Sequence, residues 1–172
     1  MKTSPTLKQL IEQIAQKHAL DLEETGAYLR LDLNGDRLII ENIGANRISI
    51  AYQFILLGEW TSDPEIVVWT GYTSNQWIPI ELYQVKDGWR ACTDIDVTGK
   101  LIGFHRREWQ AWLAEFTETI VVPNLITQGW LEQGIKSNEP VPTYTLEQMR
   151  ERGYLIEETN PSEEEVDDDC PF

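Results

Sequence analysis

Apolar and polar positions follow two different periods along the chain. Between residues 27 and 97, apolar residues alternate with polar ones or form short β-branched runs, whereas outside this region they recur every three or four residues. A period of two is typical of strands and a period near 3.6 is typical of helices. The strand-like runs are joined by short connections, which favours antiparallel pairing. The pattern predicts an α+β fold: an N-terminal helix over residues 4–20, an antiparallel meander sheet of five or six strands, and C-terminal helices packed on one face.

The segment YLRLDLNGDRLIIENI carries the clearest local signal. Leucines alternate with polar residues as far as Leu33, Asn34-Gly35 follows, and a second apolar run begins at Leu38. Two-residue hairpin turns require positive φ at both central positions, which asparagine and glycine adopt readily. We therefore predict a hairpin that turns at Asn34-Gly35.

Three more runs predict further strands, namely RISIAYQFILL, IVVW and WIPIELYQVK. The stretch Gly58–Pro64 separates the first two runs and has the composition of a turn, so we expect it to connect them. Pro79 has no N–H to donate to a ladder, and it predicts an edge strand or a bulge.

Helical periodicity returns in the second half, from about residue 106 to residue 121, and Pro123 is expected to break or kink this helix. A second helical segment is expected to end near Gly134. We predict a single α+β domain over residues 1–135, a linker with a short helix over 136–156, and an acidic disordered tail over 157–172.

The formal net charge of the 172 residues is −15, from 29 acidic and 14 basic residues. Eight of the acids lie in the predicted tail, where there is no lysine or arginine. Such a surface repels phosphate backbones and disfavours direct nucleic-acid binding. The two cysteines form no disulfide framework, and neither a signal core nor a stretch long enough to span a membrane is evident, so a cytoplasmic location away from the membrane is expected.

The segment LLGEWTSDPEIVVWTG places three carboxylates, Glu59, Asp63 and Glu65, among tryptophans. Turn chemistry alone explains Asp63 before a proline. The alternative is a divalent-metal-dependent nuclease or hydrolase, in which Asp63 or Glu65 binds Mg²⁺ and Lys86 activates water. Since no other metal-binding or cofactor-binding motif is present, we expect neither a metal nor a cofactor as the default.

Four of the seven tryptophans fall within thirty residues, and this region is either the centre of the core or a recognition surface. If it is a recognition surface, the candidate binding residues are Trp60, Trp69, Trp77, Glu59 and Tyr72.

Three longer stretches, ISIAYQFILLGEWTSDPEIVVW, WIPIELYQVKDGW and LAEFTETIVVPNLITQGWL, resemble a small family of uncharacterised bacterial domains common on plasmids and mobile elements. The resemblance covers about residues 25–134 and implies a single α+β domain. Its signature would comprise Ser49, Asp63, Pro64 and Glu65, and the family brings no established activity.

These observations favour a non-enzymatic cytoplasmic protein-binding or regulatory protein, of mobile-element or phage-like origin. An acidic DNA mimic that inhibits a nucleic-acid-binding protein is an alternative, and its carboxylates would come from the hairpin (Asp32, Asp36, Glu41) and from the segment that contains Asp63. The metal-dependent enzyme described above is the other alternative.

Overall fold

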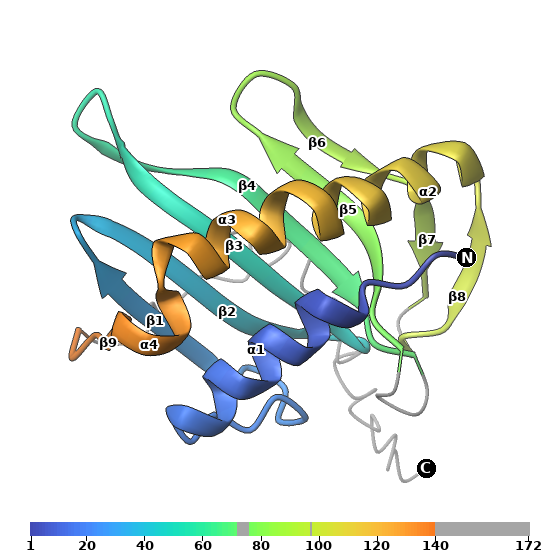
Figure 1. The fold of residues 1–172 in the computed structure, drawn as a ribbon. Helices are drawn as coiled ribbons and strands as arrows, with labels where there is room; N and C mark the ends of the chain where they lie inside the picture. The colour runs from blue at the N-terminus through green and yellow to red at the C-terminus, as the bar shows by residue number, and fades with distance from the viewer. Residues whose placement is uncertain (72–75, 97, 140–172) are drawn as a thin grey trace, which may run out of the picture.

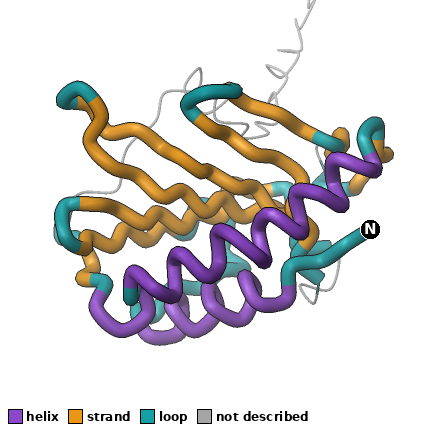
Figure 2. The backbone as a smooth tube through the Cα atoms, turned by 45° about the horizontal axis from the view of Figure 1, so that its top comes forward, coloured by secondary structure: helices purple, strands orange, loops and turns teal. Residues whose placement is uncertain are grey.

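The computed structural model describes residues 1–71, 76–96 and 98–139. Within these ranges, helices cover one face of an antiparallel sheet (Figures 1 and 2). The predicted α+β class, with a meander sheet between an N-terminal helix and C-terminal helices, is confirmed. The predicted acidic tail lies outside the described residues.

The main sheet has seven strands in the order β6-β5-β4-β3-β2-β1-β9, so each consecutive strand pairs with its neighbour in sequence from β1 to β6. A separate pair, β7-β8, forms a second small sheet. The strands are β1 (Tyr28–Leu33), β2 (Asp36–Gly44), β3 (Arg47–Leu56), β4 (Glu59–Trp69), β5 (Ile78–Gln84), β6 (Gly88–Ala91), β7 (Thr93–Ile95), β8 (Leu101–Phe104) and β9 (Ile135–Lys136).

The helical layer consists of α1 (Pro5–Lys17), α2 (Arg107–Phe116), the π-helical turn η1 (Thr117–Val121), α3 (Val122–Gln128) and α4 (Trp130–Gln133). Pro123 was predicted to break or kink the helix, and it does not break it, because α2, η1 and α3 follow one another without a gap. In the wide turn, the Val122 N–H donates to the carbonyl of Thr117, five residues back. Pro123, which has no N–H to donate, follows directly after this wide turn.

The N-terminus of α1 is capped from another helix. Ser4 occupies the N-cap position without a side-chain cap bond. Instead, the Glu118 carboxylate accepts hydrogen bonds from the backbone N–H groups of Thr6 at 3.1 Å and Leu7 at 3.2 Å. A carboxylate satisfies these donors and also interacts favourably with the helix dipole. This contact fixes α1 against the π-helical turn.

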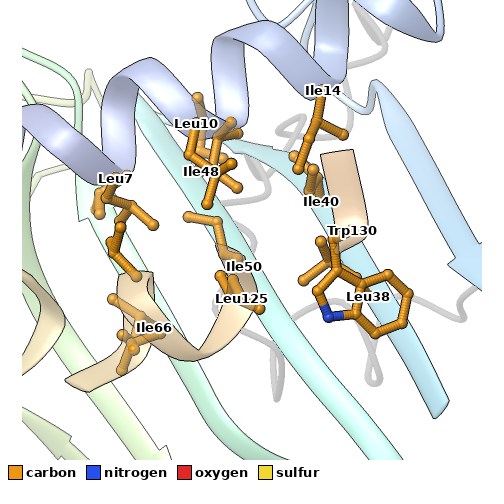
Figure 3. Close-up of a cluster of buried hydrophobic side chains, with 14 of the residues drawn as sticks. Leu7, Leu10, Ile14, Leu38, Ile40, Ile48, Ile50, Ile66, Leu125 and Trp130 are labelled. Atoms are coloured by element: carbon orange, nitrogen blue, oxygen red, sulfur yellow. The ribbon is translucent and has the colours of Figure 1, made fainter. Parts of the chain in front are cut away.

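Side chains from alternate strand positions meet the two long helices in the main core (Figure 3). Leu7, Leu10 and Ile14 of α1 face Ile48 and Ile50 of β3 in this layer. The residues between these strand positions necessarily point to the opposite face. A smaller cluster around Val67, Trp69, Ile78, Ile80 and Cys92 packs with β7-β8 residues on that other side.

The predicted connection at Gly58–Pro64 is wrong. The chain turns within two residues, Leu57 and Gly58, and β4 begins at Glu59. Asp63 and Pro64 lie inside β4, where the register shifts by a bulge and their peptide bond is cis. Pro79 is confirmed at a bulge, since the β4-β5 register shifts beside it.

Trp130 is the largest side chain that is fully buried, and its ring contacts Tyr52 edge-on at 6.3 Å between centroids. We expect Trp130→Ala to lower the free energy of unfolding by about 3–5 kcal/mol, because the cavity adds to the lost transfer free energy. Urea denaturation followed by circular dichroism measures this. Trp89→Ala, at a site that is 48% exposed, should cost far less, and equal losses would contradict this assignment of the core.

Candidate functional site

The β3-β4 hairpin extends beyond the rest of the sheet as a two-stranded ribbon. Pairing of β3 with β2 ends at Gln53, and pairing of β4 with β5 begins at Glu65. Residues 54–64 therefore have ladder partners only within the hairpin, as judged over the described residues. Figure 1 shows this ribbon projecting past the α2-η1-α3 helix.

The end of this ribbon is apolar and exposed. Ile55 is 57%, Leu56 is 40% and Leu57 is 99% exposed, and Trp60 on the returning strand is 39% exposed. We call these four residues the hairpin tip. Contiguous exposed apolar residues of this kind mark interaction sites more often than isolated ones do.

Leu57 also has a left-handed backbone conformation, which is energetically unfavourable for leucine. Its φ is +54°, and Gly58 follows at +89°. The β1-β2 turn has nearly the same geometry, with Asn34 at +54° and Gly35 at +90°. Asparagine tolerates this left-handed region, whereas for most L-residues it costs roughly 1–2 kcal/mol. The chain thus has leucine at a turn position that asparagine, as at Asn34, occupies with less strain.

Trp60 of β4 packs against Arg37 of β2, which lies on the far side of β3 in the sheet. The Arg37 guanidinium carbon lies 3.5 Å from the centroid of the indole ring, a cation–π geometry. Arg37 is fixed in turn by Asp32, whose carboxylate lies 3.3 Å from the Arg37 Nε. One face of the indole is therefore covered, while the residue remains 39% exposed.

A second partly exposed apolar surface lies along α2 and η1. Trp109, Trp112 and Phe116 stack in sequence, with centroid distances of 6.2 Å and 5.2 Å. Trp112 is 45% exposed, and Ile120, one turn beyond Phe116, is 49% exposed. We call these four residues the helix stripe.

A small cavity of about 110 Å³ joins the helix stripe to the base of the ribbon. Phe116 and Ile120 line it from the helix, and Tyr52, Asp63 and Pro64 line it from the strands. Burial and a hydrogen bond from the Tyr52 hydroxyl to Asp36 raise the pKa of Tyr52 to about 12, so this wall carries no phenolate at neutral pH.

The candidate binding residues divide into two groups. Glu59 and Trp60 lie on the exposed ribbon. Trp69 and Trp77 are 6% and 3% exposed and pack in the core, where the Trp69 Nε1–H donates to the carbonyl of Gly99 at 2.9 Å. Tyr72 lies outside the described residues.

The structure does not bring together the residues of the hypothetical metal-dependent enzyme. Asp63 lines the cavity on the helix side, whereas Glu65 accepts a hydrogen bond from Ser49 Oγ on the opposite face. Lys86 lies in the β5-β6 turn and is exposed. Within the described ranges, no group of three histidine, cysteine, aspartate or glutamate residues is arranged to hold a metal ion.

Sequence reasoning missed a polar cluster on the sheet face opposite the helices. The strand register aligns Glu41 with Ser49, then Val67 and Glu81, across four strands. Glu65 lies two pairs further along, on the same face, and accepts a hydrogen bond from Ser49 Oγ at 2.7 Å. These residues are far apart in sequence, and only the register brings them onto one face.

Burial dominates the ionisation of the pair formed by Arg47 and Glu81. The two side chains lie 3.7 Å apart, at Arg47 Nη1 and Glu81 Oε1. Desolvation raises the pKa of Glu81, more than the attraction of Arg47 lowers it, and the nearby Glu65 raises it further. Desolvation likewise lowers the pKa of Arg47. The pair is thus partly destabilised in its charged form, as expected for ions removed from water.

The chain matches no family model, no curated protein and no solved structure. The resemblance to a domain family of mobile elements therefore stays a prediction. None of the helices in the described part of the chain is long and apolar enough to cross a membrane.

The raised pKa of Glu81 predicts a pH dependence of stability. In the window between the ordinary carboxyl pKa and the raised folded value, the folded state binds more protons than the unfolded state, so stability falls as pH rises. Glu81→Gln removes this titration, and its free energy of unfolding relative to wild type should therefore increase with pH from about 4 upward. Urea denaturation at several pH values measures this difference. A relative stability that decreases with pH would show that the folded pKa is lowered instead.

Proposed function

We propose that this chain is a non-enzymatic protein-binding module that recognises its partner through the hairpin tip. The observation that carries the proposal is Leu57, which is 99% exposed and has a left-handed backbone conformation. In the free protein this side chain buries almost no surface, so burial does not offset the backbone cost. Burial of Leu57 against a partner would compensate for both features.

The neighbouring residues support the same interpretation. Trp60 is presented by Arg37 with one face of its indole covered, which lowers the conformational entropy that binding must remove. Tryptophan is enriched among the residues that dominate binding energies. The ribbon 54–64 makes ladder pairs only within itself over the described residues, so it is free to enter a cleft in another protein without disrupting the main sheet.

A protein partner fits this surface better than a nucleic acid does. The net charge of −15 opposes association with phosphates, and the exposed Glu59 lies next to the hairpin tip. Catalysis receives no support from Asp63, Glu65 and Lys86, which lie apart from one another.

The DNA-mimic alternative is not favoured by the described acids. Asp32 lies within ion-pair distance of Arg30 and Arg37, and Asp36 accepts a hydrogen bond from Tyr52. Glu41 is 3% exposed. Mimicry of a phosphate backbone requires rows of exposed and uncompensated charges, and these side chains do not provide one.

Leu57→Asn tests the proposal. Because asparagine tolerates positive φ, we expect the variant to gain about 1 kcal/mol in free energy of unfolding. We also expect it to lose the partner, since the exposed leucine is replaced by a polar side chain. Urea denaturation measures the first effect. Quantitative affinity capture from extracts of the source organism, with wild type and variant side by side, measures the second.

Ile102→Asn is the matched control, because Ile102 on β8 is 66% exposed and lies outside the ribbon. A protein captured by wild type and by Ile102→Asn, but depleted at least about tenfold with Leu57→Asn (about 1.4 kcal/mol), is the expected result. Identical capture by all three chains would overturn the proposal.

A further inference from the structure

We infer that the face of the main sheet opposite the helices is a docking site for this chain's own segment 140–156, PVPTYTLEQMRERGYLI, which crosses the face as a strap. The sequence pattern predicts a linker with a short helix for this part of the chain, and the segment lies outside the described residues. The docking site lies on the sheet and not at the hairpin tip, so the inference goes beyond the proposed function.

Strand register defines the side chains of this face. Arg30, Ile39, Ala51 and Glu65 lie side by side across β1, β2, β3 and β4. They alternate along their strands with residues of the main core, so they point away from the helices. The next row of the same face comprises Tyr28, Glu41, Ser49, Val67 and Glu81.

The centre of this face is buried, although the described helices all lie on the other side of the sheet (Figure 2). Ile39 is 8% exposed, and Ser49 and Ala51 are each 3% exposed. Among the described residues, Ile39 is the only buried apolar side chain, apart from alanines, that belongs to neither apolar cluster. Packing within these two clusters therefore does not account for the burial of Ile39.

The two short stretches 72–75 and 97 are not placed to cover Ile39. Residues 72–75 connect the Trp69 end of β4 to β5, and Trp69 lies four residues along β4 from Glu65. Residue 97 belongs to the β7-β8 connection, where the Gly99 carbonyl accepts a hydrogen bond from Trp69 Nε1 at 2.9 Å. The segment that follows residue 139 is better placed.

The described chain ends beside this face. Glu139 follows β9, which pairs with β1. Its carboxylate accepts a hydrogen bond from Arg30 Nη1 at 2.6 Å and lies 3.7 Å from Arg37 Nη2. Arg30 is the β1 member of the row that contains Ile39, so residue 140 begins next to the docking site.

The segment is long enough to cross the face. From β1 to β5 there are four interstrand spacings, about 19 Å in total. An extended chain from residue 139 to residue 150 reaches about 36 Å. Even a segment that is partly helical can therefore pass over Ile39 and reach the carboxylates beyond it.

The composition of the segment complements this face. Leu146 and Met149 are three residues apart and share one side of a helix, which suits contact with Ile39 and Ala51.

Arg150 and Arg152 are the basic residues of the segment. The far part of the face carries three carboxylates, Glu41, Glu65 and Glu81. Arg47 approaches Glu81, and two further arginines increase the complementarity. The same carboxylates repel the acidic residues from Glu157 onward, and a second copy of this chain, with its net charge of −15, is repelled as well. The charge pattern thus favours segment 140–156 as the occupant.

Limited proteolysis of the full chain tests this strap. An arginine-specific protease cleaves after Arg150 and Arg152, and a synthetic peptide of residues 139–156 gives the cleavage rate of the undocked segment. We expect cleavage at these two bonds to be at least about tenfold slower in the full chain (about 1.4 kcal/mol), because the segment must leave the face before it is cut. Mass spectrometry of the products over time measures both rates.

Two variants with matched controls identify the site. Ile39→Asp should accelerate cleavage about tenfold, whereas Ile102→Asp, at the 66% exposed isoleucine on β8, should leave it unchanged. Glu139→Lys puts a cation against Arg30 and should accelerate cleavage about threefold or more. Glu132→Lys, which makes the same charge change at an exposed position of α4, should have no effect. The Glu139 variant decides the matter if Ile39→Asp loses its near-ultraviolet circular dichroism.

Cleavage of the wild-type chain at the rate of the free peptide would overturn the inference. Equal rates in Glu139→Lys and Glu132→Lys would do the same, and so would equal rates in a folded Ile39→Asp and in Ile102→Asp. Protection that disappears when the protein is diluted would assign the cover to a second copy of the chain and would also overturn the strap.

Discussion

Packing of the two long helices onto one face of the sheet is the interaction on which the rest of the structure depends. It orients every strand from β1 to β5, because alternate side chains must enter the layer beneath α1 and α2-η1-α3. Glu118 couples the two helices by capping α1 from the π-helical turn. The β3-β4 hairpin projects past the α2-η1-α3 helix, so its end is not covered by the helical layer. Trp60 packs on Arg37, whereas Ile55, Leu56 and Leu57 are exposed there.

The opposite face of the sheet contains polar and charged side chains as well as apolar ones. Glu41, Ser49, Glu65 and Glu81 gather there through strand register, and Arg47 approaches Glu81. Charged groups in such surroundings cost free energy, as the shifted pKa values of Arg47 and Glu81 indicate. The helix-covered face is thus packed mainly with apolar side chains, while the other face combines a smaller apolar cluster with these buried polar and charged groups.

Elements with strong local signals could be predicted from the sequence, and features set by long-range pairing could not. The Asn34-Gly35 turn is confirmed, because those residues prefer the required backbone angles. The turn at Leu57-Gly58 was not predicted, since leucine is not a turn residue, and Ser62-Asp63-Pro64 has turn composition although it lies within β4. Glu59 and Trp60 were identified as candidates from composition. The stripe partner Ile120 and the cluster around Glu81 depend on packing and register, which no local pattern contains.

The π-helical turn at Thr117–Val121 has a consequence for the chain's tolerance of length changes. A wide turn holds one residue more than an α-helical turn, so every side chain after it is rotated by about 100° relative to a regular helix. Phe116 before the turn and Leu125 after it can therefore both face the sheet side of the molecule. Deletion of a single residue from this turn would remove the extra rotation. The side chains of α3 would then turn about the helix axis by about 100°, and its polar side would face the core.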